Sequence, residues 1–216
     1  MKLRPTYRRG ALTRVEVLVI IGALLLLGVC LLPALAKARA KAQRISCVSN
    51  LKQIGLSFKI WAGDHHDNYP MQVAATNGGT MELVAGGFVF PHFAVLSNEL
   101  NTPYVLVCPA DKTRIRATNF DKLSNANISY FLGLDAGETN PQMLLAGDSN
   151  LEIDGQPVPS GILNLWTNAA VGWTAERHVR RGNVALADGS VQQFTHAKLR
   201  EGLVNTGIAT NRLLIP

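Results

Sequence analysis

The chain has 216 residues, of which 47% are hydrophobic and 17% charged, with a formal net charge of +6 and a pI of about 9.5. This apolar fraction excludes an intrinsically disordered chain, and three cysteines are too few for a small disulfide-rich scaffold. A basic pI is typical of proteins that bind nucleic acid or membrane surfaces, so the position of the charge decides between them.

Nearly all of the excess positive charge lies in the first 44 residues. That segment has nine cationic residues and one anionic residue, Glu16, for a net charge of +8, whereas the remainder has 12 cationic and 14 anionic residues, for −2. A mildly acidic body does not offer the basic surface that binding to a phosphate backbone requires. The sequence therefore predicts no nucleic-acid partner.

An uncharged apolar segment covers residues 17–36. Twenty residues in an α-helix span about 30 Å, which is the thickness of the hydrocarbon core of a bilayer. The segment therefore predicts a membrane-spanning helix, which Pro33 is expected to kink without ending it. Five cationic residues precede the segment and four follow it, so flanking charge alone does not decide its orientation.

Two features of this region leave alternatives open. Ala34-Leu35-Ala36 fits the small-residue pattern at which secretory signals are cleaved, and that cleavage would leave a mature chain beginning at Lys37. Glu16 either lies near the headgroups or is neutralised by a specific cation, because a carboxylate at the edge of an apolar helix costs about 2–3 kcal/mol. A new α-amino group, made by cleavage a few residues upstream, would be such a cation.

Helical periodicity continues beyond the apolar segment. Apolar residues recur every three or four positions over residues 37–62, among them Ile45, Ile54 and Phe58, which predicts one face of an amphipathic helix. Gly63-Asp64 and Tyr69-Pro70 are expected to end it. A helix of about 50 residues is about 75 Å long, so half of it must lie in a membrane or against a neighbour.

After Pro70 the sequence changes to short apolar runs separated by Gly, Asn, Asp and Pro. This texture predicts one α+β domain packed on the second half of the long helix. Asp188-Gly189, with extended residues on both sides, predicts a hairpin with a tight two-residue turn of positive φ. The expected strands or short helices are residues 82–84, 88–90, 104–107, 128–132, 143–145, 183–186 and 191–194.

The N-terminal region resembles the processing signal of type IV pilins and type II secretion pseudopilins: a basic leader, Gly10, Ala11, Leu12, then Glu16 and a long apolar helix. The resemblance implies cleavage by a prepilin peptidase, methylation of the new N-terminal residue, and a Glu at the fifth mature position. Cleavage after Ala11 makes Glu16 fifth and Leu12 the leading residue, whereas cleavage after Gly10 makes it sixth. The first register is favoured, although the usual leading Phe is absent.

A second resemblance lies near the C-terminus. His178, followed after nine residues by Asp188-Gly189, is similar to the H-X9-DG signature of prepilin-type processing-associated proteins. Further blocks of the chain look like recurrent blocks of that family, around Pro33, around Cys47, around Cys108 and at residues 147–149. Their order along the chain makes the resemblance specific.

Together these resemblances imply a pilin-like α+β fold, with a long bent N-terminal helix packed on a small antiparallel-sheet head. The expected organisation is a leader over residues 1–11, a membrane helix over 12–36, a periplasmic helix half over 37–63 and a head over 64–216. They imply an inner-membrane, single-pass subunit with a cytoplasmic N-terminus and a periplasmic or extracellular head. Its partners would be the prepilin peptidase and methyltransferase and other pilin-like subunits, with no cofactor and no catalytic activity of its own. A membrane-tethered binding module that does not polymerise and an envelope hydrolase remain the alternatives.

Cys47 and Cys108 both lie in the expected exported part, whereas Cys30 lies in the apolar helix. In an extracytoplasmic domain these two residues predict a disulfide, and the alternative is two unrelated buried thiols. A bridge closing a loop of about 60 residues would stabilise the domain by about 4 kcal/mol in the chain-entropy account.

No metal site is predicted. The run Asp64-His65-His66-Asp67 is interpreted as a solvated helix end, because adjacent helical residues point in different directions. Ser149, His178 and Asp188 are the residue types of a hydrolase triad, but the G-x-S-x-G pattern is missing. A hydrogen bond from His178 to Asp188 at the hairpin base is the favoured interpretation, and a cation between Asp148 and Asp188 is the alternative.

Two further groups are expected to be structural: a solvated surface cluster of Arg177, Arg180 and Arg181, and core aromatics at Trp61, Trp166 and Trp173.

Overall fold

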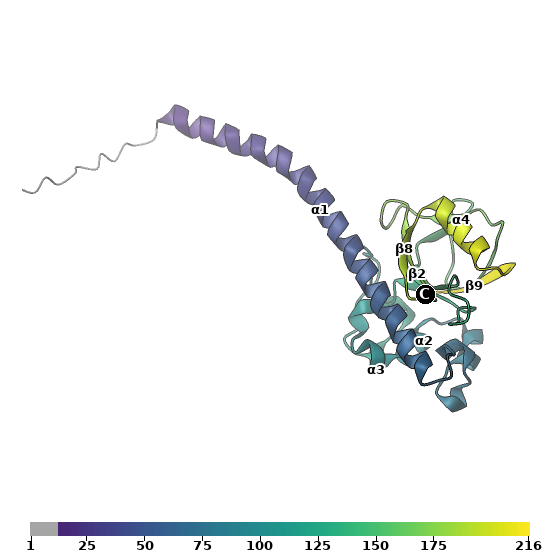
Figure 1. Ribbon diagram of the computed structural model, residues 1–216. Coiled ribbons are helices and arrows are strands. Elements are labelled where there is room, and N and C mark those ends of the chain that lie inside the picture. Colours follow the sequence, from purple (N-terminus) through teal and green to yellow (C-terminus); the bar gives the residue numbers. More distant parts are fainter. Residues whose placement is uncertain (1–12) are drawn as a thin grey trace, which may run out of the picture. The chain divides into compact units, whose positions relative to one another are not determined.

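The structure is a computed structural model that describes residues 13–216 (Figure 1). The chain divides into two compact units, one ending at Lys41 and one running from Ala42 to Pro216. Helix α1 (Arg14–Gly63) begins in the first unit and ends in the second, at the glycine expected to end it. The predicted leader residues Gly10, Ala11 and Leu12 lie outside the described residues.

In the first unit, α1 is apolar and exposed to the solvent. Its large hydrophobic side chains between Val15 and Leu35 are all 41–73% exposed, so none is covered by the rest of the described unit. The helix continues through Pro33 without interruption. By length and composition, α1 is the one helix among the described residues that could cross a membrane.

In the second unit, α1 buries one face against the head. The buried residues Cys47, Leu51, Ile54, Phe58 and Trp61 are spaced four, three, four and three positions apart, as one face of an α-helix requires. The placement of Ile45 on this face is wrong, because its side chain is 61% exposed. Residue 45 is nine positions before Ile54, and at about 3.6 residues per turn this places it on the opposite face of the helix.

Residues 64–129 form short helical turns and irregular loops. The predicted segments 82–84, 88–90 and 104–107 prove to be helical or turn-like and contain no strand. Two short α-helices are present, α2 (Phe90–Ala94) and α3 (Ser97–Leu100), and Phe93 of α2 packs its ring 6.0 Å from that of Phe58. The 3-10 turns are η1 (Pro70–Gln72), η2 (Ala75–Asn77), η3 (Met81–Gly86), η4 (Pro103–Leu106), η5 (Phe120–Lys122) and η6 (Asn125–Asn127).

The head contains two antiparallel sheets. A six-stranded sheet has the order β5-β9-β1-β2-β7-β8, and a three-stranded sheet has the order β4-β3-β6. Helix α4 (His196–Asn205) lies between β8 and β9 in the chain and begins at an N-cap, Thr195. The strands are β1 (Tyr130–Gly133), β2 (Leu144–Asp148), β3 (Leu151–Ile153), β4 (Gln156–Pro157), β5 (Gly161–Trp166), β6 (Val171–Trp173), β7 (Gly182–Leu186), β8 (Val191–Phe194) and β9 (Thr210–Ile215).

Both faces of the six-stranded sheet are covered. Tyr130 and Leu132 of β1 pack with the buried face of α1, while Phe131 between them packs with α4 and the smaller sheet. The central strands β1, β2 and β7 are consequently buried at every position. This double covering explains why the strands read as short continuous apolar runs rather than as alternating patterns.

The hairpin predicted around Asp188-Gly189 is present between β7 and β8, but its turn differs from the prediction. The Gly189 N–H donates to the Leu186 carbonyl, and the Leu186 N–H donates to the Ser190 carbonyl, both at 2.9 Å. Three residues therefore form the loop, and only Gly189 has a positive φ, of 85°. This is the three-residue arrangement in which glycine takes the left-handed position after a tight turn.

A buried histidine in α2 makes the stability of the head dependent on pH. Burial lowers the pKa of His92 to about 4, and its Nδ1 lies 2.6 Å from the Thr80 hydroxyl. The unfolded chain therefore binds more protons at this residue between pH 6.5 and about 4. We expect the free energy of unfolding to fall by up to about 3 kcal/mol as the pH decreases through this range. Denaturation of His92→Asn over the same range should show a smaller slope, and equal slopes would contradict the assignment.

Candidate functional site

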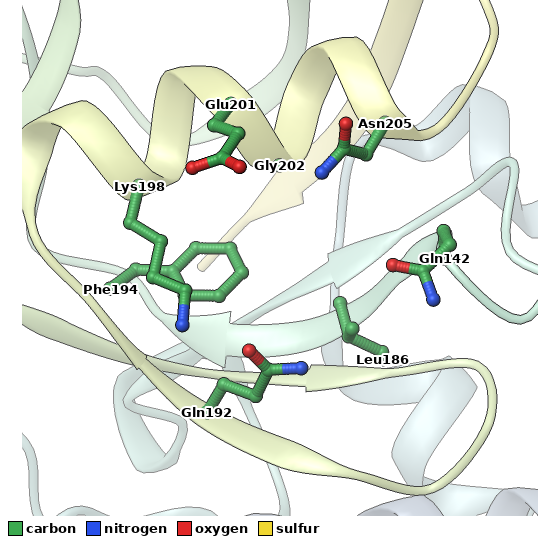
Figure 2. A pocket seen from close by; sticks show the side chains of 8 residues that line it. All are labelled: Gln142, Leu186, Gln192, Phe194, Lys198, Glu201, Gly202 and Asn205. Atoms are coloured by element: carbon green, nitrogen blue, oxygen red, sulfur yellow. The ribbon is translucent and has the colours of Figure 1, made fainter.

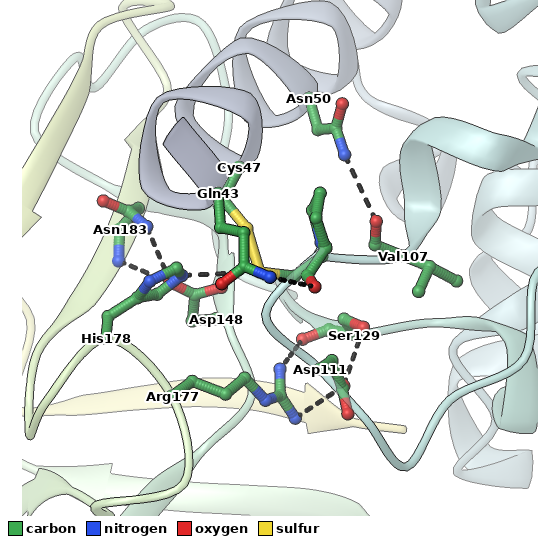
Figure 3. The surroundings of a disulfide bond; sticks show 12 residues. Gln43, Cys47, Asn50, Val107, Asp111, Ser129, Asp148, Arg177, His178 and Asn183 are labelled. Atoms are coloured by element: carbon green, nitrogen blue, oxygen red, sulfur yellow. Dashed lines mark hydrogen bonds and ion pairs between the residues drawn. A yellow bond between two sulfur atoms is a disulfide. The ribbon is translucent and has the colours of Figure 1, made fainter. Parts of the chain in front are cut away.

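The most polar part of the core surrounds a disulfide between α1 and the loop after η4 (Figure 3). Cys47 and Cys108 are 61 residues apart, their sulfur atoms are bonded at 1.96 Å, and both residues are completely buried. Next to the disulfide, Gln43 Nε2 donates to the Pro109 carbonyl and Asn50 Nδ2 donates to the Val107 carbonyl, each at 3.3 Å. The helix is thus attached to this loop by one covalent bond and two hydrogen bonds.

His178 and Asp148 lie against the disulfide. His178 Nε2 is 3.4 Å from Cys108 Sγ and 3.5 Å from Asp148 Oδ2. Asp148 ends strand β2 and is completely buried. Its Oδ2 accepts hydrogen bonds from the backbone N–H (2.7 Å) and side-chain amide (3.0 Å) of Asn183, while its Oδ1 has no partner among the described residues. Figure 3 shows these side chains converging on the two sulfur atoms.

Burial sets the protonation of this pair. It lowers the pKa of His178 to about 4, and the positive charges of Arg44 and Arg177 act in the same direction. Burial also raises the pKa of Asp148 to about 6, although the hydrogen bonds from Asn183 oppose that shift. At pH 7 the pair is therefore a neutral imidazole beside a carboxylate rather than an ion pair.

A second buried pair lies beside the first. Arg177 Nη2 is 3.0 Å from Asp111 Oδ2, and the same guanidinium donates to the Ser129 carbonyl at 2.7 Å and to the Ser149 hydroxyl at 3.2 Å. Burial alone would raise the pKa of Asp111, but Arg177 and hydrogen bonds from Thr113 and Ser129 outweigh it and lower the pKa. The expectation of a solvated cluster is therefore wrong for Arg177, which is 6% exposed, whereas Arg180 and Arg181 are exposed.

The backbone between the two pairs and strand β7 is unusual. His178, Val179 and Arg180 have φ values of 49°, 55° and 56°, in the left-handed region that residues with a Cβ avoid. Arg44 of α1 donates to the His178 carbonyl at 3.1 Å, which helps to hold this turn. The turn directs His178 into the core and leaves Val179 79% exposed.

The structure contradicts the predicted partner of His178. Asp188 is exposed at the hairpin turn, where its Oδ1 accepts from the Ser190 N–H at 2.7 Å. His178 precedes β7 and Asp188 follows it, and a five-residue strand separates its ends by about 17 Å. Ser149, His178 and Asp188 therefore do not come together as a hydrolase triad, and Asp148 and Asp188 do not come together as a cation site.

The histidine run at residues 64–67 and the three tryptophans are not part of this site. His65 stacks on Trp61 with ring centroids 3.5 Å apart, and its Nδ1 lies 2.7 Å from the Trp61 carbonyl, at the end of α1. Of the three tryptophans, Trp61 and Trp173 are buried, whereas Trp166 is 59% exposed and is not a core residue. In the described part of the chain, the one group of metal-ligand residues gathered closely enough to hold an ion is Cys47, Cys108, Asp148 and His178, and the run at residues 64–67 forms none.

A small pocket lies between α4 and the β7–β8 hairpin (Figure 2). Its volume of about 60 Å³ is far below the roughly 300–1,000 Å³ of small-molecule sites. Lys198 and Phe194 both line it, and Lys198 Nζ lies 5.8 Å from the centre of the Phe194 ring. The pocket therefore has room for solvent but not for a cofactor.

At the start of α1, Glu16 has a local partner. The Thr13 N–H and hydroxyl donate to Glu16 Oε2 at 2.7 and 2.8 Å, and the Glu16 N–H donates to the Thr13 hydroxyl at 3.3 Å. This reciprocal pattern is a capping box, which the Thr-x-x-Glu spacing would have revealed in the sequence. Glu16 thus satisfies backbone groups at the start of its own helix.

Comparison with known proteins gives no match to a family model, to a curated protein or to a solved structure, so these comparisons assign the chain to no family.

Proposed function

We propose that this chain is a pilin-like or pseudopilin-like subunit of a type II secretion or type IV pilus-like system. The first half of α1 lies in the inner membrane, with the N-terminus in the cytoplasm and the head in the periplasm. A prepilin peptidase removes the leader, the new terminus is methylated, and the subunits then assemble through their N-terminal helices. The chain is the substrate of this chemistry and performs no catalytic step.

The observation that carries the proposal is the contrast between the two halves of α1. The apolar residues between Val15 and Leu35 are all exposed, whereas Cys47 to Trp61 bury one face in the head. So large an exposed apolar surface must be covered by lipid or by neighbouring helices. A pilin-like subunit would meet this requirement at both stages, with lipid around the helix in the membrane and other subunits around it after assembly.

The disulfide supports a head outside the cytoplasm, because disulfides persist in oxidising compartments. The head carries the Cys47–Cys108 bond, and α1 enters the head directly from its apolar half. A head on the oxidising side of the membrane implies a cytoplasmic N-terminus, as processing by a prepilin peptidase requires.

The capping box favours one alternative, a membrane-tethered extracytoplasmic binding module that does not polymerise. In that case Glu16 serves only its own helix, through Thr13. In the proposed assembly, Glu16 also neutralises the N-terminal ammonium of a neighbouring subunit. Both expected cleavage sites leave Thr13 and Glu16 in the mature chain, so the two roles can coexist.

Glu16→Gln separates these two roles. Glutamine can replace glutamate in a capping box but has no charge to offer an ammonium group. An unpaired charge among apolar helices costs roughly 2.5–3.5 kcal/mol, so we expect assembly of Glu16→Gln to weaken about 100-fold. The measurement is the yield of crosslinked oligomers in membranes at matched expression. Formation of the Cys47–Cys108 disulfide serves as the check that the head has folded. Glu16→Gln that assembles as well as the unaltered chain would support the tether and contradict the proposal.

A further inference from the structure

Four side chains around the disulfide supply the atoms that zinc prefers in proteins. Cys47 Sγ, Cys108 Sγ, His178 Nε2 and a carboxylate oxygen of Asp148 all lie within 4.8 Å of one another, and all four residues are buried. Thiolate sulfur, imidazole nitrogen and carboxylate oxygen are the donors of tetrahedral zinc sites. We propose that reduction of the Cys47–Cys108 disulfide converts this cluster into a zinc site with these four residues as ligands.

Two of the required separations are already present. Donors bound to one tetrahedral zinc ion at about 2.0–2.3 Å lie roughly 3.3–3.8 Å from one another. The observed distances are 3.4 Å from Cys108 Sγ to His178 Nε2 and 3.5 Å from His178 Nε2 to Asp148 Oδ2. The other donor atoms also lie within 4.8 Å of one another, and reduction frees the two sulfur atoms to move apart.

The surroundings suit a bound zinc ion. Two thiolates, the Asp148 carboxylate and Zn²⁺ sum to a charge of −1, and the cationic Arg44 lies close by, donating to the His178 carbonyl at 3.1 Å. Asn183 orients the Asp148 carboxylate through two hydrogen bonds, as outer-sphere partners of metal ligands do.

The disulfide is converted into the zinc site in two steps, reduction and metal binding. A phosphine reductant transfers two electrons to the disulfide, the S–S bond breaks, each sulfur takes a proton from water, and the phosphine becomes its oxide with the water oxygen. Zn²⁺ then replaces the two thiol protons, which pass to the buffer. The oxidised head has no thiolate to offer and should not bind zinc at this position.

The test uses the full-length chain in detergent, with Cys30→Ser to remove the thiol outside the cluster. Zn²⁺ is titrated into oxidised and phosphine-reduced protein, and Co²⁺ replaces it for spectroscopy. We expect one Zn²⁺ per reduced chain, none per oxidised chain, and the absorption of tetrahedral, thiolate-bound Co²⁺ in the reduced sample only. A reduced chain that binds no stoichiometric zinc would overturn the proposal.

Two pairs of variants locate the site. Asp148→Asn and His178→Gln should weaken binding to the reduced chain by more than the roughly 10–100-fold that loss of an outer-sphere partner costs. The matched control, His65→Gln with His66→Gln, removes two histidines outside the cluster and should leave the affinity unchanged. Binding that is lost in the control and kept in the cluster variants would contradict the proposal.

Folding of the reduced chain is followed by near-ultraviolet circular dichroism, to which the buried Trp61 and Trp173 contribute. If the signal is lost on reduction, zinc should restore it in the Cys30→Ser chain and fail to do so in Asp148→Asn. If the reduced Cys30→Ser chain binds no zinc and zinc does not restore its signal, the result contradicts the proposed site. The proposed site belongs to the head alone, so it can be present whether or not the chain assembles.

Discussion

Replacing Cys47 and Cys108 together with alanine is expected to lower the free energy of unfolding of the head by about 4 kcal/mol. The bond joins residues 61 positions apart, so its loss allows the unfolded chain a large gain in conformational entropy. Of the three bonds that attach α1 to the loop after η4, it leaves only the two hydrogen bonds from Gln43 and Asn50. The measurement is urea denaturation of the full chain in detergent, followed through tryptophan fluorescence, to which the buried Trp61 and Trp173 contribute, with a chelator present to exclude bound metal.

The matched control is Cys30→Ala, which removes the cysteine that lies outside the bond. It should leave the urea midpoint of the head unchanged. Reduction of the unaltered chain in the presence of chelator should reproduce most of the loss seen in the double variant. A double variant within 1 kcal/mol of the unaltered protein would show that packing and hydrogen bonds alone hold α1 to the head.

Arg177→Met is expected to destabilise the head by about 3–5 kcal/mol. The substitution keeps much of the side-chain volume but leaves the Asp111 carboxylate, whose side chain is 2% exposed, without its cation. It also removes the donors to the Ser129 carbonyl and the Ser149 hydroxyl. The same denaturation assay measures the loss.

Arg212→Met is the matched control, because Arg212, whose side chain is 53% exposed, forms an ion pair with Asp135 at 2.6 Å. Solvent screens this pair, so its loss should cost no more than about 1 kcal/mol. The double variant Arg177→Met with Asp111→Asn should be less destabilised than the sum of the single variants, since no buried charge is then left unpaired. Equal losses for Arg177→Met and Arg212→Met would contradict a structural role for the buried pair.

The long helix could be predicted from local sequence because its determinants are local. The run of residues 17–36 without charge and the glycine at residue 63 give its span, and the structure ends α1 at Gly63. The hairpin at Asp188-Gly189 is equally local, although the turn length depends on which residue pairs with Ser190. Leu186 takes that position, and the loop has three residues as a result.

The sheet order and the polar core could not be read in the same way. Strand β9 lies between β5 and β1, so its place depends on partners about 50 and 80 residues away in the chain. The shared motif favours Asp188 as the partner of His178, whereas its actual neighbour, Asp148, belongs to β2, the strand that pairs with β7. Arg177 is buried because Asp111 and Ser129 approach it from distant loops, which no local pattern of basic residues indicates.

The mass of the intact mature protein, purified from its native membrane, tests the proposed subunit role most directly. The proposal predicts a chain that begins at Leu12, or at Ala11 in the alternative register, and carries one added methyl group. It also predicts that both Cys47 and Cys108 are oxidised in that chain. A mature chain that begins at Lys37 would show cleavage of an ordinary secretory signal and would contradict the proposal, and so would a chain that retains its leader.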